Sequence, residues 1–130
     1  MTVPSTYPVQ RPVVLLVDDD PAVTHAVQFS FDLEGLDVHG YRDAESLLAC
    51  DDLPERGCLV LDYNLPGIDG LELLEHLRGR GVRLPAVLIT TNPRPRIQLR
   101  AAAAGVPIVE KPLLSDALLT TVRNALAHSS

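Results

Sequence analysis

The sequence predicts a doubly wound α/β protein, with five β-strands in one parallel sheet and helices on both faces. Two observations predict this fold. Apolar runs of four or five residues alternate with longer segments of helical period, and the runs are continuously apolar, as expected for strands that helices cover on both sides. A chain of 130 residues with 46% hydrophobic content suits one such domain and excludes a disordered chain.

The first unit consists of a strand at residues 12–17 and a helix that begins after Asp20. Asp20 is a suitable N-cap, Pro21 suits the first helical position, and the helix is predicted to end before Gly35. Its inner face is predicted from apolar residues that recur every four positions, namely Val23, Val27 and Phe31.

The second unit is a half-buried strand at residues 36–41, expected at the sheet edge, and a short helix that Asp43 caps and that ends at Ala49. Cys50 follows this helix and Cys58 opens the next strand. Two cysteines at this spacing form no metal motif, so both are expected to be free thiols, with Cys58 buried.

The third strand is predicted at residues 58–61 and leads into an irregular loop at residues 62–67, where proline and glycine interrupt regular structure. The helix after this loop is expected to end near residues 79–81. Its inward-facing residues are predicted to be Leu71, Leu74 and Leu77.

The fourth strand is predicted at residues 86–90, followed by a proline-stiffened connection at 92–95 and an alanine-rich helix that ends at Gly105. The fifth strand is predicted at residues 106–109. Ser115 is expected to cap the last helix, whose apolar stripe consists of Leu118, Leu119, Val122 and Leu126.

Right-handed crossovers leave few arrangements for five βα units, and the predicted strand order is 2-1-3-4-5. This order places the first and third strands side by side, where open α/β sheets bind ligands at the carboxyl ends of the strands. Asp18, Asp19 and Asp62 are therefore expected to meet in one crevice. Carboxylates so close repel one another, and a hard divalent cation with oxygen ligands, Mg²⁺, is the natural counter-charge.

Two further strands end on groups that can handle phosphate. Thr90 offers a hydroxyl and Lys111 an ammonium group, while Asp62 stands alone at the end of its strand as the best candidate nucleophile. Such a set can form and hold an acyl phosphate. Asp20 is expected to act as a helix cap and to take no part in this chemistry.

These residues resemble the receiver domains of two-component response regulators, of the chemotaxis-regulator type. The matching segments are the acidic pair at residues 17–19, the phosphorylation loop at 62–67, the hydroxyl of Thr90 and the Lys-Pro pair at 111–112. The resemblance covers residues 12–128. It implies a flavodoxin-like three-layer sandwich of the type (βα)5.

The resemblance implies that Asp62 accepts a phosphoryl group from a histidine kinase or a histidine phosphotransfer protein. Thr90 and Lys111 would hold the phosphoryl oxygens, and the peptide bond from Lys111 to Pro112 would be cis. The protein would be a switch in a phosphorelay, and its only chemistry would be self-phosphorylation and autodephosphorylation on Asp62. It would act on a downstream protein through the face of the fourth helix, fifth strand and fifth helix.

The resemblance also implies a Mg²⁺ site. Asp19 and Asp62 would bind the ion directly, the backbone carbonyl of Asn64 would be a third ligand, and Asp18 would act mainly through water.

Three features depart from the family pattern. Ile108 stands where the family commonly has Tyr or Phe, which removes the usual aromatic switch. Thr91 stands where the family usually has a small residue, and this β-branched side chain is expected to narrow access to the phosphoryl group. The spacing from Thr90 to Lys111 is one residue shorter than usual, with prolines between them, so the fourth helix is expected to start late or to be short and mobile.

Charge and composition bound the remaining expectations. Residues 1–11 are expected to form a flexible lead-in and residues 12–130 a single receiver domain, with no output domain among them. The net charge of −6 argues against nucleic acid as a direct partner. No membrane span or secretory signal is predicted, which favours a cytoplasmic protein. The family resemblance implies a monomer or a weak dimer. The one local basic group is expected to be a solvated helix face: Arg94, Arg96 and Arg100.

Two alternatives remain open at this point. A pseudo-receiver would keep the fold and signal through protein contacts without phosphorylation, and the aliphatic Ile108 is its main support. A small aspartate-dependent phosphohydrolase would use an Asp-x-Asp motif, which Asp18 and Asp20 could supply, but the chain is short for that fold and Asp62 would have no task.

Overall fold

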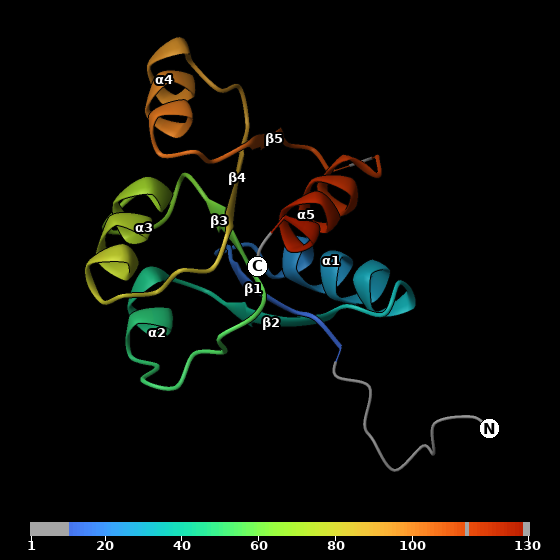
Figure 1. Cartoon of the computed structure of the whole chain (residues 1–130). Coiled ribbons are helices and arrows are strands. Elements are labelled where there is room, and N and C mark those ends of the chain that lie inside the picture. Colours follow the sequence, from blue (N-terminus) through green and yellow to red (C-terminus); the bar gives the residue numbers. More distant parts are fainter. Residues whose placement is uncertain (1–10, 114, 129–130) are drawn as a thin grey trace, which may run out of the picture.

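The computed structural model describes residues 11–113 and 115–128, and it contains one parallel sheet with the strand order β2-β1-β3-β4-β5. Both the fold class and the strand order were predicted correctly. The lead-in predicted for residues 1–11 lies outside the described residues except for Arg11. The five strands are β1 (Val13–Val17), β2 (Asp37–Tyr41), β3 (Cys58–Asp62), β4 (Ala86–Thr90) and β5 (Ile108–Glu110) (Figure 1).

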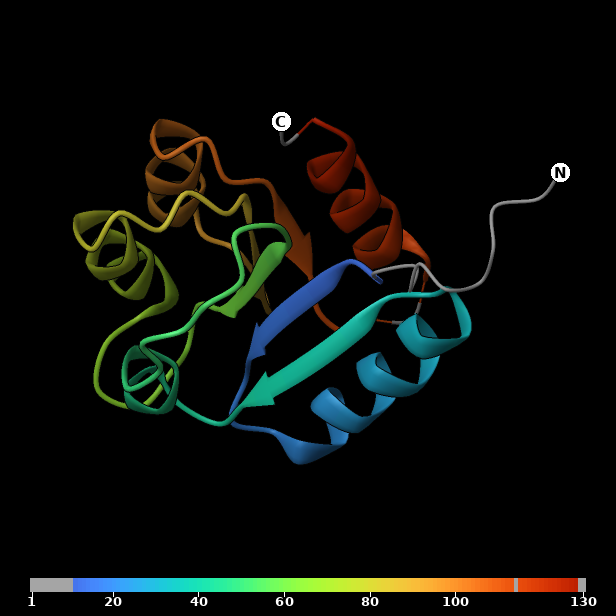
Figure 2. The same ribbon diagram turned by 60° about the horizontal axis from the view of Figure 1, so that its bottom comes forward.

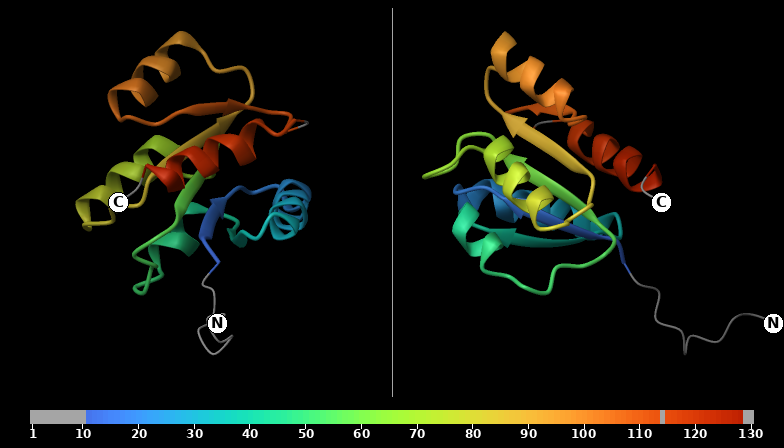
Figure 3. Two further views of the ribbon diagram at one scale, coloured as in Figure 1. Left: turned by 45° about the vertical axis from the view of Figure 1, so that its right-hand side comes forward. Right: turned by 60° about the vertical axis from the view of Figure 1, so that its left-hand side comes forward.

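Helices cover both faces of the sheet and make three layers, as Figures 1 and 2 show. The bounds of the helices are α1 (Pro21–Leu33), α2 (Ala44–Leu48), α3 (Gly70–Gly79), α4 (Pro95–Ala103) and α5 (Ala117–Ala127). Helices α1 and α5 lie on one face, and α2, α3 and α4 lie on the other (Figure 3). None of the helices in the described residues is both long and apolar enough to cross a membrane.

Alternate residues of the central strands divide the core in two. Leu15 and Leu59 point into the layer that α2 and α3 cover, whereas Leu16 and Val60 point into the layer that α1 and α5 cover. All four side chains are at most 1% exposed. The central strands are buried on both faces, which explains why their sequences are continuously apolar.

Helix α1 begins as its sequence predicts. The side chain of Asp20 accepts a hydrogen bond from the backbone N–H of Ala22 at 2.9 Å, and Pro21 is the first helical residue. The helix ends before Gly35, whose φ of +82° suits glycine. Of the predicted inner residues, Val27 and Phe31 are buried and Val23 is half-buried.

Helix α3 is anchored at its N-terminus by a capping box between Asp69 and Glu72. The residue after this cap, Gly70, comes so close to the end of β3 that a Cβ atom there would lie 2.5 Å from the carbonyl oxygen of Asp62. All three predicted inward leucines are buried, and Leu73, which was not predicted, is buried as well.

The predicted bounds near the C-terminus were wrong by one or two residues. The fifth strand is Ile108–Glu110 and not 106–109, because Val106 closes the end of α4 by donating its N–H to the carbonyl of Ala101 at 2.9 Å. Helix α5 has Asp116 at its N-cap position, although the hydroxyl of Ser115 does accept a hydrogen bond from Ala117 at 3.3 Å. The fourth helix begins at Pro95, the last residue of the predicted connection, and ends at Ala103, with Ala104 as its C-cap.

Candidate functional site

The strand register brings the predicted site residues to one edge of the sheet. Val17 pairs with Leu61, so the residues that follow each of them, Asp18 and Asp62, lie side by side. On the other side of β3, Thr90 ends β4 and accepts a hydrogen bond on its backbone carbonyl from the N–H of Lys111 at 2.8 Å. The carboxyl ends of β1, β3, β4 and β5 therefore supply all the groups of the site, as expected for an open α/β sheet.

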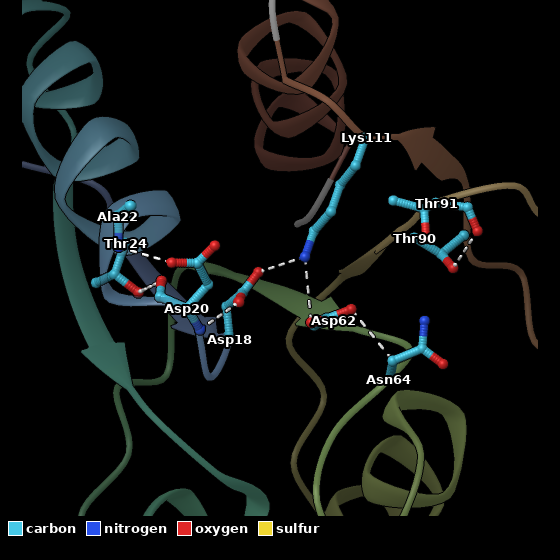
Figure 4. A network of polar contacts seen from close by, with 9 residues as sticks. All are labelled: Asp18, Asp20, Ala22, Thr24, Asp62, Asn64, Thr90, Thr91 and Lys111. Atoms are coloured by element: carbon cyan, nitrogen blue, oxygen red, sulfur yellow. Dashed lines mark hydrogen bonds and ion pairs between the residues drawn. The ribbon is translucent and has the colours of Figure 1, made fainter.

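Lys111 bridges the two buried acids, as Figure 4 shows. Its Nζ atom lies 2.9 Å from the Oδ2 of Asp18 and 3.2 Å from the Oδ2 of Asp62. The Asp18 side chain is fully buried, that of Asp62 is 5% exposed and that of Lys111 is 16% exposed. Two carboxylates and one ammonium group thus share a site with little water, and one positive charge offsets two negative ones.

Backbone N–H groups orient the two carboxylates. The N–H of Asp20 donates to the Oδ1 of Asp18 at 2.8 Å, and the N–H of Asn64 donates to the Oδ1 of Asp62 at 3.1 Å. Each acid therefore uses one oxygen for its own loop and turns the other toward Lys111. The buried Oδ2 of Asp18 makes an ion pair but no hydrogen bond of ordinary geometry, which leaves it an incompletely satisfied acceptor.

The pKa values of Asp62 and Lys111 are both raised, but for different reasons. Burial and then the charge of Asp18 raise the pKa of Asp62, and Lys111 offsets only part of this effect. Burial alone would lower the pKa of Lys111, but its contacts with Asp18 and Asp62 outweigh burial and raise it. The two acids therefore favour the charged form of Lys111, whereas burial and the neighbouring Asp18 disfavour the charged form of Asp62.

Three carboxylates could hold a metal ion here. Oxygen atoms of Asp18, Asp19 and Asp62 all lie within 4.8 Å of one another, and Asp19 is exposed to solvent beside the two buried acids. An all-oxygen donor set with an incompletely satisfied buried carboxylate fits a hard divalent cation. The meeting of the three acids confirms the prediction, while the direct or water-mediated role of each acid and the part of the Asn64 carbonyl stay predictions.

The predicted switch residues have different surroundings. Thr90 is buried, and its hydroxyl donates to the backbone carbonyl of Thr91 at 3.2 Å, away from Asp62 (Figure 4). Thr91 is exposed, and Ile108 packs in the core layer of α2 and α3. The peptide bond from Lys111 to Pro112 is cis, as the family resemblance implied.

The position of Asp20 bears on the phosphohydrolase alternative. This residue is exposed, and its carboxylate caps α1 at the N–H of Ala22. The second acid of the Asp-x-Asp motif is therefore engaged in helix capping, as predicted. Asp62, for which that alternative had no task, lies at the centre of the site beside Lys111.

One interaction beside the site was not predicted, and it corrects the expectation of a solvated arginine face. Arg94 and Arg96 are exposed, but Arg100 is half-buried and makes an ion pair with Asp69 at 3.1 Å. Its guanidinium also donates to the hydroxyl of Tyr63 at 3.3 Å. The only sequence signal for this contact is that Tyr63 and Asp69 lie at the two ends of the loop after β3. Arg100, which binds both, lies 31 residues beyond Asp69.

Comparison with known families and sequences gives a consistent result. Residues 14–123 match the family described as the response regulator receiver domain. The chain is 43% identical over 116 residues to the C4-dicarboxylate transport transcriptional regulatory protein DctD of Pseudomonas aeruginosa, a match that covers 87% of this chain and 25% of DctD. It is 33% identical over 118 residues to the transcriptional regulatory protein FixJ of Azorhizobium caulinodans, covering 90% of this chain and 56% of FixJ. The chain thus spans from a quarter to about half of the length of these relatives.

Solved structures show the same fold. The structure of FixJ-N aligns with a TM-score of 0.82 at 28% identity and covers 94% of this chain and 98% of that one. The response regulator TrrA of Thermotoga maritima, solved in complex with Mg²⁺ and beryllium fluoride, aligns with a TM-score of 0.75 at 26% identity, covering 88% of this chain and 99% of that one.

Proposed function

The chain belongs to the response regulator receiver domain family of two-component systems. We propose that Asp62 is its phosphoacceptor and that phosphorylation switches its contacts with a partner. One observation carries the assignment to Asp62. Asp62 lies at the carboxyl end of the central strand β3, its side chain is 5% exposed, and the Nζ of Lys111 lies 3.2 Å from its Oδ2. Asp18 also contacts Lys111, but its side chain is fully buried and follows β1, whereas the loop after Asp62 is open to solvent at Asn64.

The proposed reaction is a direct transfer from a phosphohistidine. The carboxylate of Asp62 attacks phosphorus, the new P–O bond makes an acyl phosphate, and the P–N bond of the donor breaks with its electron pair going to the imidazole nitrogen. Lys111 can then pair with a phosphoryl oxygen, since its ammonium already faces the attacking carboxylate. The hydroxyl of Thr90 can leave the Thr91 carbonyl and donate to another phosphoryl oxygen.

We assign Asp18, Asp19, Asp62 and the backbone carbonyl of Asn64 to a Mg²⁺ site, in which Asp19 and Asp62 bind the ion directly. The clustered carboxylate oxygens support this assignment, and so does the Mg²⁺ present in the structure of TrrA. When bound, the ion would supply positive charge to the phosphoryl oxygens. The residues themselves do the positioning: the Asp20 and Asn64 N–H groups hold the carboxylates of Asp18 and Asp62 in place.

The partners follow from the same assignment. The donor is a histidine kinase or a histidine phosphotransfer protein, and the acceptor of the signal is a downstream protein that binds the face made by α4, β5 and α5. A groove of about 400 Å³ along α4 and β5 supports the second part, and Gln98, Ala102, Ile108 and Glu110 are among its lining residues. Thr90 and Lys111 belong to the strand ends that lead directly into this face.

Beryllium trifluoride with Mg²⁺, a mimic of the acyl phosphate, tests the proposal. Saturating ligand should shift the backbone amide signals of Asn64, Thr90 and Lys111 in the wild-type protein and leave those of Asp62→Asn unchanged. An unchanged wild-type spectrum would favour a pseudo-receiver. Steady hydrolysis of a phosphomonoester that Asp18→Asn abolishes and Asp62→Asn preserves would favour the phosphohydrolase.

A further inference from the structure

Arg100 joins α4 to the loop that follows Asp62. The guanidinium of Arg100, a residue of α4, donates hydrogen bonds to the carboxylate of Asp69 at 3.1 Å and to the hydroxyl of Tyr63 at 3.3 Å. These two partners lie at opposite ends of the loop, since Tyr63 follows Asp62 directly and Asp69 is the N-cap of α3. The side chains of Arg100 and Asp69 are 33% and 21% exposed, so the ion pair is partly shielded from solvent.

The loop between these two partners is tightly closed. The N–H of Gly70 donates to the carbonyl of Tyr63 at 3.0 Å, and the N–H of Tyr63 donates to the carbonyl of Ile89 in β4 at 2.9 Å. The N–H of Asn64 holds the carboxylate of Asp62. A displacement of the loop when the chemistry at Asp62 changes would therefore move Tyr63 and Asp69 together, and both are held by one guanidinium.

Helix α4 has few other attachments. Ala101 is its one buried residue, and Ile97 is half-buried. Over residues 11–113 and 115–128, Arg100 is the only α4 side chain with a hydrogen bond or ion pair to another helix or strand or to the loop after β3, because Gln98 bonds only to Pro93 in the preceding connection. The side-chain hydrogen bonds of this helix to the loop after β3 thus depend on Arg100.

We propose that Arg100 is a positioning residue that couples the loop after Asp62 to helix α4, so that a change at Asp62 reaches the output face through Tyr63 and Asp69. This inference rests on the proposed phosphorylation of Asp62. It gives the chain a route that does not depend on the aromatic side chain that Ile108 replaces, because the phenol comes from Tyr63 after β3 and the cation from α4. A planar guanidinium can engage both partners at once, whereas a lysine ammonium at the end of a flexible chain is less suited to this geometry.

The test compares amide spectra of the whole protein with and without beryllium trifluoride and Mg²⁺. In the wild type, signals of Asn64 and Thr90 and signals of α4 should both shift. In Arg100→Gln the shifts at Asn64 and Thr90 should stay near their wild-type size, while the shifts in α4 should fall to less than half. Tyr63→Phe, which removes only one hydroxyl, should reduce the α4 shifts by a smaller amount.

Arg96→Gln is the matched control, because Arg96 lies on the same helix and is exposed. It should leave the α4 response at its wild-type size, and Arg100→Lys should restore part of the response through Asp69. Equal shifts of the α4 amide signals in Arg100→Gln and Arg96→Gln would overturn the inference. So would wild-type α4 signals that do not shift although those of Asn64 and Thr90 do. If the amide signals of Asn64 and Thr90 in the wild type do not shift either, the proposed function is overturned, and the inference with it.

Discussion

The Nζ of Lys111 lies 2.9 Å from the Oδ2 of Asp18, a shorter distance than the 3.2 Å to the Oδ2 of Asp62. Asp18 is fully buried, and this ion pair is the counter-charge that the structure provides for its second oxygen. Lys111 is thus shared between an acid that is expected to hold metal-bound water and an acid that is expected to be phosphorylated. Loss of this one ammonium should affect both.

Replacing Lys111 by methionine should destabilise the fold. The variant keeps an unbranched side chain but leaves two buried carboxylates without their cation, and we expect the free energy of unfolding to fall by about 3 kcal/mol at neutral pH. The loss should shrink at acidic pH, because protonation of the carboxylates removes their repulsion. Urea unfolding at both pH values measures it. Lys111→Arg keeps the charge, and a methionine variant as stable as the arginine variant would contradict the account.

Replacing Asp62 by asparagine should have the opposite effect at neutral pH. Burial and the charge of Asp18 raise the pKa of Asp62 in the folded state, so the ionised carboxylate opposes folding. Asp62→Asn should therefore raise the free energy of unfolding by about 1 kcal/mol at pH values above the folded-state pKa. The gain should disappear below the unfolded-state pKa, where Asp62 is protonated in both states. A pH series of unfolding curves checks this, and an asparagine variant less stable than the wild type at neutral pH would be inconsistent with it.

Gly70 should tolerate no side chain. A Cβ atom there would lie 2.5 Å from the carbonyl oxygen of Asp62, which is backbone that cannot move aside without shifting the loop after β3. We expect Gly70→Ala to lower the free energy of unfolding by about 2 kcal/mol or more and to weaken Mg²⁺ binding. At the other end of α3, a Cβ atom on Gly79 would meet no other atom within 4 Å, so Gly79→Ala should be neutral or slightly stabilising. Equal effects at the two positions would argue against this view of the loop.

Thr90 should matter for holding the phosphoryl group. Its hydroxyl donates to the Thr91 carbonyl at 3.2 Å and would have to turn to reach a phosphoryl oxygen. We expect Thr90→Ala to weaken binding of beryllium trifluoride about tenfold, which corresponds to one lost hydrogen bond to a charged acceptor. Thr90→Ser keeps the hydroxyl and should bind nearly as the wild type does. Isothermal titration of the three proteins compares them, and an unchanged affinity in Thr90→Ala would remove Thr90 from the proposed site.

Much of the fold and of the site could be predicted because both depend on local patterns. Asp20 and Pro21 mark the start of α1, and the central strands are recognisable by unbroken apolar runs. Asp18, Asp62 and Lys111 each lie at the end of a strand, so the strand order alone brings them together. Boundaries were less accurate where tertiary contacts decide them, as at Val106, which bonds back to Ala101 and so cannot begin β5.

The polar contacts within the site could not be predicted from the same patterns. The sequence indicates that Lys111 lies near the acids, but it does not indicate that Lys111 binds Asp18 more closely than Asp62. The contact of Arg100 with Tyr63 and Asp69 depends on where α4 packs, and a cluster of three arginines gives no information on which of them turns inward. Such choices depend on side-chain geometry across elements far apart in the sequence.

The most direct test of the central claim is the intact mass of the protein after incubation with acetyl phosphate and Mg²⁺. The wild-type protein should gain the mass of one phosphoryl group, and the gain should require Mg²⁺ and disappear on raising the pH with hydroxide, which hydrolyses acyl phosphates. Asp20→Asn, which alters an exposed helix cap, should gain the same mass, and Asp62→Asn should gain none. A phosphoryl group on Asp62→Asn, or none on the wild type, would contradict the account.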